Sequence, residues 1–600
     1  MNALSPDVRA LRPAFDSPST WETLLCALDY WAHHCPDRQA FAFLGDDGTV
    51  THAYTFATLQ SHALAIAAVL QAKTMTGDRV ILMYPPGVAF IPAFFGCLYA
   101  GTIAVPVNPP TRARHLDRID SVMADAGAHV VLATQSVRDA VGSTPLPPAW
   151  RRCEWLDAEA VPIVWAERWR PHRPRPHDVA FLQYTSGSTG TPRGAMITHR
   201  NMMHNQWMFH RAFATDAASV FCGWVPLFHD MGLMIQVVHP VYIGASSLLL
   251  SPYDVMARPA RWLRALTRHR ATHTAAPNFA YDVCVQHVTA EERATIDLSH
   301  LRCAINGAEP VRESTMCRFA AAFAPHGLRT SALLPAYGMA EATLMIAAAP
   351  HGQPAAYSHF SRRDLDRGRV ACPQSTASAD TVSLPGYLVS FGDQEVRIVD
   401  PVRRVLLADG VIGEVWVRGA HVAKGYWKKQ RASQDLLRAR CVGIDAERRY
   451  LRTGDLGFFY QGRLFLTGRA KDVMIIRGRN IYPEDLEHAI RQTGSRWLQG
   501  LNAAFTQDAH GEACVVVVQE LPGDATLTNE ALQACSADLA AEVNATFDIA
   551  LHTVLFLPPR TIPRTSSGKV RRQHTKWLYA TGALPVLHTW HGCVQCASRC

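Results

Sequence analysis

The segment 184–194 combines small residues with hydroxyl and cationic side chains in a pattern suited to binding phosphate. It reads Tyr-Thr-Ser-Gly-Ser-Thr-Gly-Thr-Pro-Arg-Gly, so three glycines and five Ser or Thr residues fall within eleven positions. Backbone N–H groups of such a loop can surround phosphate oxygens, and Arg193 can add a positive charge. There is no Gly-Lys-Ser/Thr sequence here, which excludes a Walker A loop.

The simplest alternative for this segment is a Ser/Gly-rich connector without a ligand. An apolar strand expected at residues 179–182 precedes the loop, and a helical run expected from His199 follows it. This preceding strand and the cation at the end of the loop favour the phosphate-binding interpretation.

The loop resembles the phosphate-binding signature of the adenylate-forming superfamily, which includes acyl-CoA synthetases, peptide-synthetase adenylation domains and firefly-type luciferases. That superfamily usually carries Lys where this chain has Arg193. Six further segments resemble its motifs in the same order, at residues 224–232, 306–310, 337–343, 450–457, 468–472 and 563–569. The resemblance extends over roughly residues 20–580, and seven ordered matches make coincidence negligible.

This resemblance implies ATP and Mg²⁺ as cofactors and assigns roles to individual residues. Tyr337 would stack on adenine, Asp455 would hold the ribose hydroxyls, and Arg469 would lie near the ribose-phosphate. The full set implied to bind ATP or AMP is Thr185, Ser186, Gly187, Ser188, Thr189, Gly190, Arg193, Gly307, Ala308, Glu309, Tyr337, Gly338, Met339, Asp455 and Arg469.

The resemblance also identifies catalytic residues, a hinge and an acyl site. Lys569, Glu341 and Thr185 are the implied catalytic residues, with Glu341 coordinating Mg²⁺ and Lys471 acting as the pivot of the hinge. The residues implied to flank the acyl pocket are Phe228, His229 and Met231.

Each of these residues has an ordinary structural explanation when it is considered alone. Glu341 would be a favourable charge at a helix N-terminus, and Asp455 after Thr-Gly would be a turn residue. His229 would be a satisfied polar residue, and Lys569 a solvated loop lysine. Only the joint order of the motifs gives all four a functional interpretation.

The implied reaction explains these residue types. A carboxylate is a poor nucleophile and must approach an anionic triphosphate, so catalysis depends on positioning and on neutralising charge. The glycine-rich loop would hold the β and γ phosphates of the leaving pyrophosphate. Lys569 would bridge the attacking carboxylate and the α-phosphate and then withdraw as a small domain rotates. No side chain needs to form a covalent intermediate.

Within the superfamily, the chain looks like a fatty acyl-AMP ligase. An insertion at about residues 347–390 resembles the insertion of those ligases, which is held to disfavour the conformation that uses CoA. The acyl group would then pass to the phosphopantetheine of an acyl carrier protein. That family often has Ser-Cys-Gly where this chain has Ser390, Phe391 and Gly392, and residues 477–483 also fit it closely. The alternative is a tolerated surface loop without a role.

Three other functions remain open from the sequence. A long-chain fatty acyl-CoA ligase is the main alternative. An amino-acid adenylating enzyme is less favoured, because Asp230 is the only nearby candidate to bind a substrate ammonium group. A catalytically silent adenylate-binding protein is disfavoured because Glu341, Asp455, Arg469 and Lys569 are all retained.

The elements that must position these residues predict an α/β protein. Strands at residues 79–83, 102–107 and 129–132 alternate with helices at 88–99 and 113–126, which favours a mostly parallel sheet covered by helices. Residues 140–178 look like a connection. Further along, we expect strands at 395–399, 414–417, 463–467, 472–476, 512–519 and 553–557, and helices at 483–491 and 529–543.

We therefore predict a large N-terminal domain, residues 1–470, of mixed, mostly parallel sheets packed with helices and with a β-barrel-like subdomain. Residues 471–585 would form a small mobile C-terminal α+β domain that carries the catalytic lysine and is joined by a hinge. Residues 586–600 form a Cys/His-containing tail. Its Cys593 and Cys596 have a zinc-binding spacing, but a disordered or variable tail is favoured over a metal site.

Composition supports an ordinary globular protein and excludes several classes. The chain has 600 residues, 48% hydrophobic and 18% charged, with a net charge of +8, which suits a nucleotide or an acidic partner. An Arg/Pro-rich stretch at residues 168–176 lacks the spaced aromatic residues of a nucleic-acid binder. Residues 231–253 contain no Asp, Glu, Lys or Arg, but polar residues and Pro240 interrupt the run and favour a buried helix and strand over a membrane span.

Fifteen mostly isolated cysteines and an N-terminus without an apolar run predict a cytoplasmic protein with reduced thiols. The expected partners are a fatty acid and an acyl carrier protein. Because no carrier domain follows the lysine loop, the carrier is expected to be a separate chain.

Overall fold

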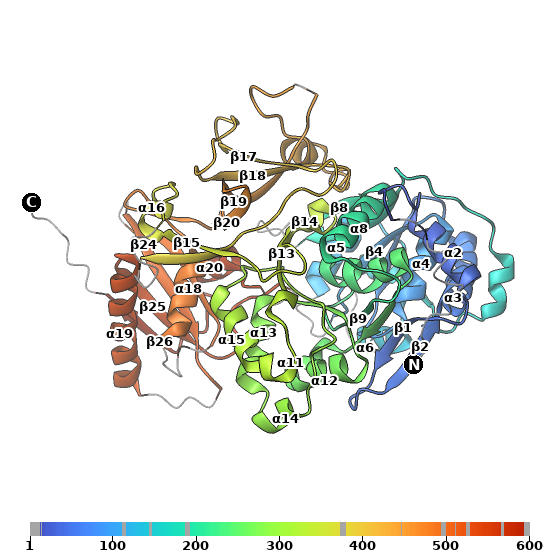
Figure 1. The fold of residues 1–600 in the computed structure, drawn as a ribbon, viewed down its shortest axis with the longest axis horizontal. Coiled ribbons are helices and arrows are strands. Elements are labelled where there is room, and N and C mark those ends of the chain that lie inside the picture. Colours follow the sequence, from blue (N-terminus) through green and yellow to red (C-terminus); the bar gives the residue numbers. More distant parts are fainter. Residues whose placement is uncertain are drawn as a thin grey trace, which may run out of the picture.

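The computed structural model describes residues 13, 15–110, 116–142, 147–185, 192–372, 380–445, 447–493, 498, 500–509, 512–523, 528–565 and 569–592 (Figure 1). The side chains of residues 118, 148, 149, 185, 509 and 512 are outside this description. In Figure 1 the N-terminal sheets lie to the right, the β17–β20 sheet lies at the top, and residues 474–592 lie to the left.

A six-stranded sheet near the N-terminus has the order β6-β5-β3-β4-β7-β8. β3 pairs in parallel with β4 and β5, β5 with β6, and β4 with β7, whereas β8 runs antiparallel to β7. This confirms the predicted alternation, with α4 (Phe90–Ala100) and α5 (Leu116–Ala126) as connecting helices. The strands are β3 (Arg79–Met83), β4 (Ile103–Val107), β5 (Val130–Ala133), β6 (Glu154–Asp157), β7 (Val179–Thr185) and β8 (Arg193–Thr198).

Residues 140–178 are more than the connection that the sequence suggests. They contain β6, which extends the sheet, and the 3₁₀ helix η2 (Ile163–Arg168). Beyond η2, the indole Nε1 of Trp169 donates to the carbonyl of Tyr99 at 3.1 Å. β6 was missed because it is a four-residue edge strand without a fully buried side chain, so it lacks the apolar run of a central strand.

A second sheet of eight strands has the order β14-β13-β12-β11-β9-β10-β1-β2. Its strands are parallel except at the two edges, where β2 and β14 are antiparallel to their neighbours. The carboxyl ends of β12 and β13 are adjacent, as expected of a ligand-binding edge in a parallel sheet. The strands are β1 (Gln39–Leu44), β2 (Val50–Thr55), β9 (Val220–Gly223), β10 (Ser246–Leu249), β11 (His273–Ala276), β12 (Cys303–Asn306), β13 (Leu333–Gly338) and β14 (Met345–Ala348).

Helices pack on both faces of these sheets. One buried cluster joins α2 (Leu24–His34), α3 (Phe56–Lys73), α4 and α8 (His199–Phe213) to strands of both sheets. A second cluster joins the other face of the eight-stranded sheet to α12 (Ala260–Arg268), α13 (Asn278–His287) and α15 (Glu313–Phe323). α8 begins where the side chains of Thr198 and Asn201 each accept the other's backbone N–H, a capping box that ends β8 and starts the helix.

The uncharged run from residue 231 is buried, as predicted. It forms α9 (Asp230–Leu233), the π-helix η3 (Met234–Val238) and α10 (His239–Ile243), and then β10. The side chains of η3 and α10 are all buried in the protein core. Within the described part of the chain, no helix is both long enough and apolar enough to span a membrane.

The sequence predicted a β-barrel-like subdomain, and here the described residues form a four-stranded antiparallel sheet in the order β17-β18-β19-β20. It consists of β17 (Glu395–Val399), β18 (Gly413–Arg418), β19 (Leu451–Tyr460) and β20 (Arg463–Arg469), with α17 (Gln430–Ala432) and the π-helix η7 (Ser433–Leu437) between β18 and β19. The predicted insertion forms an antiparallel hairpin, β15 (Tyr357–Ser361) and β16 (Thr381–Pro385), with α16 (Arg362–Asp366) after β15.

The C-terminal part has its own buried cluster and the expected mixture of strands and helices. It consists of β21 (Met474–Ile476), β22 (Arg479–Ile481), α18 (Pro483–Gln492), β23 (Asn502–Ala509), β24 (Glu512–Glu520), α19 (Asn529–Phe547), β25 (Leu551–Leu557), α20 (Arg572–Ala580) and β26 (His588–His591). The start of the predicted variable tail is therefore ordered, because β26 pairs antiparallel with β25. Cys593, Cys596 and Cys600 lie outside the described residues.

Candidate active site

The predicted phosphate loop connects two antiparallel strands. Thr185 is the last residue of β7 and Arg193 the first of β8, and their backbones pair. The helix expected from His199 is confirmed as α8, but the sequence analysis did not identify β8, which lies between the loop and this helix. Small Gly194 and Ala195 hid this strand, since they are not typical strand formers. The side chain of Thr185 and the residues Ser186, Gly187, Ser188, Thr189 and Gly190 lie outside the described residues.

The start of β8 is held close to the end of β7. The hydroxyl of Tyr184 donates to Asp125 Oδ2 at 2.8 Å. A Cβ atom at Gly194 would lie 2.9 Å from the Tyr184 ring, so glycine permits this close approach. The arrangement holds Arg193 at the mouth of the loop, where the sequence predicted a cation.

Arg193 and Glu341 are brought together by Tyr426, which the sequence analysis did not identify. The Arg193 guanidinium lies 5.7 Å from the centre of the Tyr426 ring, within range of a cation–π interaction. The Tyr426 hydroxyl donates to Glu341 Oε1 at 2.8 Å. An aromatic residue after Gly425 carries no spacing signal of its own, so only the fold shows this contact.

Glu341 lies in a short 3₁₀ helix, η6 (Ala340–Ala342), immediately after β13. Its carboxyl group is buried, and this burial raises its pKa, although the hydrogen bond from Tyr426 and the nearby Arg469 oppose the rise. The backbone carbonyl of Glu341 accepts the N–H of Ala423 at 2.9 Å. The carboxylate is thus fixed in place, with one oxygen held by Tyr426.

The predicted adenine-binding turn follows β12. Ala308 has a φ of 68°, in the left-handed region, and a Cβ atom at Gly307 would lie 2.9 Å from the carbonyl oxygen of Ala336 on β13. The carboxylate of Glu309 accepts the backbone N–H of Phe279 at 2.6 Å, and burial raises its pKa. This turn therefore packs against the end of β13, where Tyr337 lies.

Gly338 and Met339 form the tight turn that carries η6. A Cβ atom at Gly338 would lie only 1.8 Å from the carbonyl oxygen of Leu344, and Met339 N donates to that same oxygen at 2.8 Å. Glycine is therefore required at position 338 for steric reasons. The turn sets the direction in which Glu341 leaves the sheet.

Tyr337, Asp455 and Arg469 form one connected group, as their predicted roles around a nucleotide require. The Tyr337 hydroxyl donates to Asp455 Oδ2 at 2.7 Å, and Arg469 Nε lies 3.0 Å from Asp455 Oδ1. Asp455 and Arg469 are direct partners across β19 and β20. The Asp455 carboxylate raises the pKa of Arg469, which keeps this guanidinium charged.

Lys569 joins the same site from the C-terminal part of the chain. Its side chain is solvent-accessible although atoms of both parts of the chain surround it. Loss of hydration and the positive charge of Arg469 lower the pKa of Lys569, whereas Asp230, Glu309 and Asp455 oppose that effect. Residues from four separate predicted motifs are thus close enough to act on this one amine.

The predicted acyl-site segment contains Asp230, one of the carboxylates whose charge acts on this amine. Asp230 Oδ1 is 2.7 Å from His229 Nδ1 and accepts the N–H of Met231 at 2.8 Å. Burial raises the pKa of Asp230, but His229 and Lys569 outweigh burial and lower it overall. Phe228 accepts a hydrogen bond from Gln183 Nε2 through its carbonyl. Asp230 is therefore engaged by side chains of the protein, which disfavours the amino-acid alternative.

Lys471, the predicted pivot, follows β20 directly. Burial lowers its pKa, as does the positive charge of Arg469, while Asp472, Asp455 and Glu341 oppose the change. The predicted pivot is therefore electrostatically linked to the residues predicted to hold the nucleotide. This link consists of charge interactions alone.

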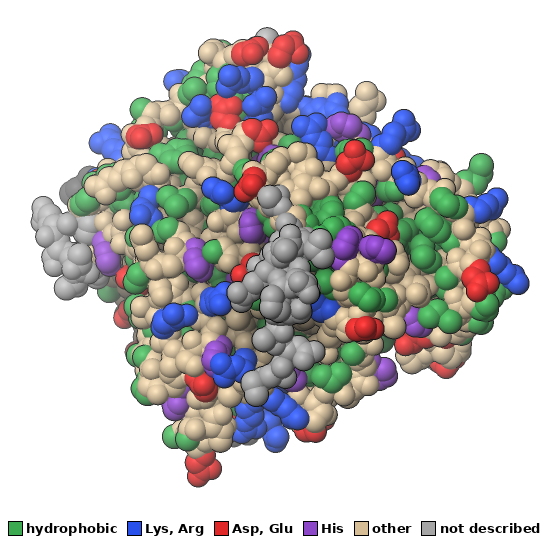
Figure 2. Space-filling model, turned by 45° about the vertical axis from the view of Figure 1, so that its right-hand side comes forward, with side chains coloured by type: hydrophobic (Ala, Val, Ile, Leu, Met, Phe, Trp, Pro, Cys, Tyr) green, Lys and Arg blue, Asp and Glu red, His purple; other side chains and the backbone are tan. Residues whose placement is uncertain are grey.

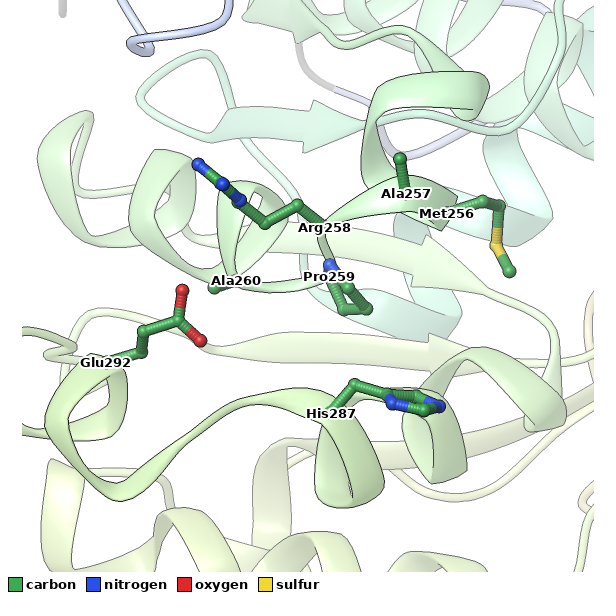
Figure 3. Close-up of a pocket in the computed structure, with 7 residues that line it drawn as sticks. All are labelled: Met256, Ala257, Arg258, Pro259, Ala260, His287 and Glu292. Atoms are coloured by element: carbon green, nitrogen blue, oxygen red, sulfur yellow. The ribbon is translucent and has the colours of Figure 1, made fainter. Parts of the chain in front are cut away.

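One cavity of the described surface is lined by none of these residues. It has a volume of about 390 Å³ and lies between α11 (Pro252–Ala257), the start of α12 and the end of α13 (Figure 3). Its lining residues are Met256, Ala257, Arg258, Pro259, Ala260, His287 and Glu292. None of them belongs to a predicted motif, so we place the candidate site at the convergence around Lys569 and not in this cavity.

Comparison with known proteins shows which proteins this chain resembles. Residues 28–427 match the family model described as AMP-binding enzyme. The chain is 35% identical to a medium-chain-fatty-acid–[acyl-carrier-protein] ligase of Moorena producens, over 97% of this chain and 99% of that protein. It is 32% identical to a long-chain-fatty-acid–AMP ligase of Mycobacterium tuberculosis, over 91% of this chain and 94% of that protein.

Solved structures give the same result. A fatty acyl-adenylate ligase from Legionella pneumophila, in complex with acyl adenylate and pyrophosphate, superposes with a TM-score of 0.74 at 32% identity, over 96% of this chain and 99% of that chain. A structure from work on fatty acyl-adenylate ligases of E. coli and L. pneumophila superposes with a TM-score of 0.83 at 28% identity, over 94% and 98% of the two chains.

Proposed function

The chain belongs to the AMP-binding enzyme family, and on that premise we propose that it activates a fatty acid as acyl-AMP and transfers the acyl group to a carrier protein. ATP and the fatty acid are the substrates of the first step, and pyrophosphate leaves. In the second step, the phosphopantetheine thiol of a separate acyl carrier protein attacks the acyl-adenylate.

The observation that supports this proposal most directly is the convergence on Lys569. Side chains at positions 230, 309, 455 and 469 all act on its amine, although they are far apart in the sequence. A cation flanked by carboxylates and by Arg469 is suited to a reaction in which negative charge develops between two anionic substrates.

In the proposed mechanism the chain positions its substrates and does not form a covalent bond to them. Tyr337 would stack on the adenine, Asp455 would accept hydrogen bonds from the ribose hydroxyls, and Arg469 would neutralise the adjacent phosphate. The loop from Thr185 to Arg193 would hold the leaving phosphates. Lys569 would donate to the fatty carboxylate and the α-phosphate together, which lowers their repulsion during attack.

The residues around Glu341 fit a magnesium ion. Mg²⁺ prefers oxygen ligands and is usually held by one or two carboxylates together with waters and substrate phosphates. Glu341 offers such a carboxylate, with Tyr426 fixing one of its oxygens. When bound there, the ion would supply charge neutralisation for the triphosphate.

We propose that residues 1–470 form the binding domain and residues 471–585 a mobile domain that turns about Lys471. The insertion at about residues 347–390 would restrict this rotation, because α16 contacts the C-terminal part. Asp366 Oδ2 lies 2.7 Å from Arg479, and the Arg362 guanidinium lies 4.6 Å from the centre of the Phe547 ring. A charge-assisted hydrogen bond of this kind contributes about 1.5–3 kcal/mol.

This restriction supports transfer to a carrier protein over transfer to CoA. Rotation of the C-terminal part would have to break the contacts of Asp366 and Arg362. The alternative, a long-chain acyl-CoA ligase, requires that these contacts do not limit the reaction with CoA. A silent adenylate-binding protein requires that no acyl-AMP forms at all.

The test is to incubate the protein with ATP, Mg²⁺ and a mixture of fatty acids, and then to add CoA or a holo acyl carrier protein. Mass spectrometry follows acyl-AMP and any thioester. We expect acyl-AMP to persist with CoA and to be discharged by the carrier. Rapid formation of acyl-CoA would contradict the carrier assignment, and absence of acyl-AMP with every fatty acid would contradict the activity itself.

The role of the insertion is tested by the double variant R362A/R479A, with R363A as the matched control. Arg363 lies on the same helix as Arg362 and is exposed. If the contacts restrict rotation, the double variant should gain acyl-CoA formation while R363A should not. Equal, negligible CoA use in all three proteins would show that these contacts do not determine the acceptor.

A further inference from the structure

A pocket lined mostly by arginine lies beside the β17–β20 sheet, and nothing in the proposed reaction uses it. It has a volume of about 300 Å³ and is lined by Arg404, Gln434, Arg438, Ala439, Arg440 and Arg449. We call it the arginine pocket. No carboxylate lines it. Lys and Arg side chains also gather at the top of the molecule, over this sheet (Figure 2).

Backbone pairing forces three of these arginines onto one face. Ala439 and Tyr450 form an isolated antiparallel bridge and exchange two hydrogen bonds, of 2.9 and 3.0 Å. Both of their side chains are buried. Because side chains alternate along a strand, the neighbours of this pair point to the opposite, solvent face.

Arg440 and Arg449 are therefore direct partners across the bridge, with Arg438 on the same face. Like charges directly opposite each other destabilise a pair of strands. The buried pair of Ala439 and Tyr450 fixes this register, so the arginines cannot separate without unpairing the backbone.

Arg404 joins the group through a turn that an arginine does not prefer. Its φ is 57°, in the left-handed region that glycine adopts at lower cost. Its carbonyl accepts the N–H of Val442 at 2.7 Å, which ties the turn to the segment that carries Arg440. The protein thus keeps a cation at a position where both backbone strain and charge repulsion disfavour it.

Nearby carboxylates do not neutralise this group. Glu395 pairs with Arg397, Arg418 and Arg448. Asp400 accepts the N–H groups of Arg403 and Val402, which lower its pKa.

Two of the arginines donate to backbone carbonyls in the part of the chain that the structure describes. Arg438 donates to the carbonyl of Lys424 and Arg449 to that of Arg448. There, no ion pair joins Arg404, Arg438 or Arg440 to a carboxylate. The positive charges of Arg404, Arg438 and Arg440 are therefore available to an anion from solution.

We propose that the arginine pocket binds a diphosphate group, either as inorganic pyrophosphate or as part of a nucleotide. The planar guanidinium fork matches two oxygens of a phosphate better than an ammonium group does. A terminal phosphate alone carries a charge of about −1.5 to −2 at pH 7, so a diphosphate is a polyanion whose charge complements a cluster of arginines. A pocket of about 300 Å³ has the size of a small-molecule site.

Hydrogen–deuterium exchange on the full chain tests this site separately from the active site, because it reports by position. Pyrophosphate and ADP are titrated at constant ionic strength, and exchange of the amides of residues 434–442 is followed. We expect saturable protection of this segment in the wild-type protein. Tighter protection by ADP would identify the nucleotide as the source, and tighter protection by pyrophosphate the free anion.

The variants isolate the pocket. In R404Q/R440Q the apparent Kd should rise by about tenfold or more for each arginine removed, since a charge-assisted hydrogen bond of about 1.5 kcal/mol corresponds to that factor. R403Q is the matched control, because Arg403 is an exposed arginine of the same turn that does not line the pocket. R440K keeps the charge without the fork and should bind less tightly than the wild type.

Three results would overturn the proposal. One is the absence of protection in the wild-type protein, and another is an equal loss in R403Q, which would indicate only a general surface field. The third is equal protection by a polyglutamate peptide, which would indicate a carboxylate-bearing partner. Thermal unfolding without anion checks that the variants fold. R404Q/R440Q should melt at the same temperature as the wild type or at a higher one, because repulsion between the arginines is removed. If the double variant does not fold, R440K provides the test.

Discussion

Tyr426→Phe is the change that tests the geometry around Glu341 most sharply. The variant removes one hydroxyl, which donates to Glu341 Oε1 at 2.8 Å, and leaves the ring against Arg193. The lost hydrogen bond to a charged group corresponds to about 1.5–3 kcal/mol. Because about 1.4 kcal/mol equals one pKa unit, the pKa of Glu341, already raised by burial, should rise further by about one to two units.

The expected result follows from the sign of this shift. A carboxyl group with a higher pKa binds its proton more strongly, so the cation-binding carboxylate is present only at higher pH. The acidic limb of the pH profile for ATP–pyrophosphate exchange should therefore move upward by about one to two units in Tyr426→Phe. The free energy of unfolding should also fall by about 1.5–3 kcal/mol near neutral pH and by less in acid, where Glu341 is protonated.

The matched control is Tyr281→Phe. Tyr281 is also buried, and its hydroxyl donates to the carbonyl of Ile305 at 2.9 Å, so it loses a comparable hydrogen bond next to no carboxylate. It should lose stability without a change in the pH profile. If Tyr426→Phe and wild-type profiles coincide, the hydroxyl does not control the ionisation of Glu341, and the reasoning is wrong.

Three further changes test other parts of the structure. Lys569→Ala should reduce pyrophosphate exchange by about 10²–10³-fold, and its melting temperature should hardly change because the side chain is solvent-accessible; an active variant would refute its role. Gly338→Ala should lower the free energy of unfolding in urea by about 3 kcal/mol or more, because its Cβ would lie 1.8 Å from the Leu344 carbonyl oxygen. Gly142→Ala, where a Cβ would meet open space, should be nearly neutral. Burial lowers the pKa of His421 to about 3, so in acid the native state binds fewer protons than the unfolded state. The free energy of unfolding should therefore fall as the pH drops below about 6.5. His421→Leu should reduce this fall by roughly 3 kcal/mol between pH 7 and 4.5.

The sequence predicted best where one physical signal dominated. The buried strands β3 and β4 are almost uniformly apolar, and Gly101 ends α4 in the left-handed conformation, so both the strands and the helix between them could be identified. The motif residues were found by order and not by chemistry. In the structure, residues from four of these motifs act on the amine of Lys569.

Features that depend on the partner across space could not be predicted. β8 contains Gly194 and Ala195 and is recognisable only from its pairing with β7. Tyr426 has no motif around it, and its contact with Glu341 spans 85 positions of the chain. β26 forms because β25 offers an edge, which the composition of residues 588–591 does not reveal.

The pairing of Asp455 with Arg469 has a kinetic consequence. These two residues face each other across β19 and β20, and the chain leaves that sheet immediately afterwards, at Lys471. In the proposed mechanism, a rotation that begins at Lys471 would carry Lys569 away and leave the two side chains proposed to hold the ribose and the phosphate in their strand register. The adenylate would then stay bound between activation and transfer. Its slow dissociation, and not the rotation of the C-terminal part, would limit the rate at which this reactive intermediate is lost to water.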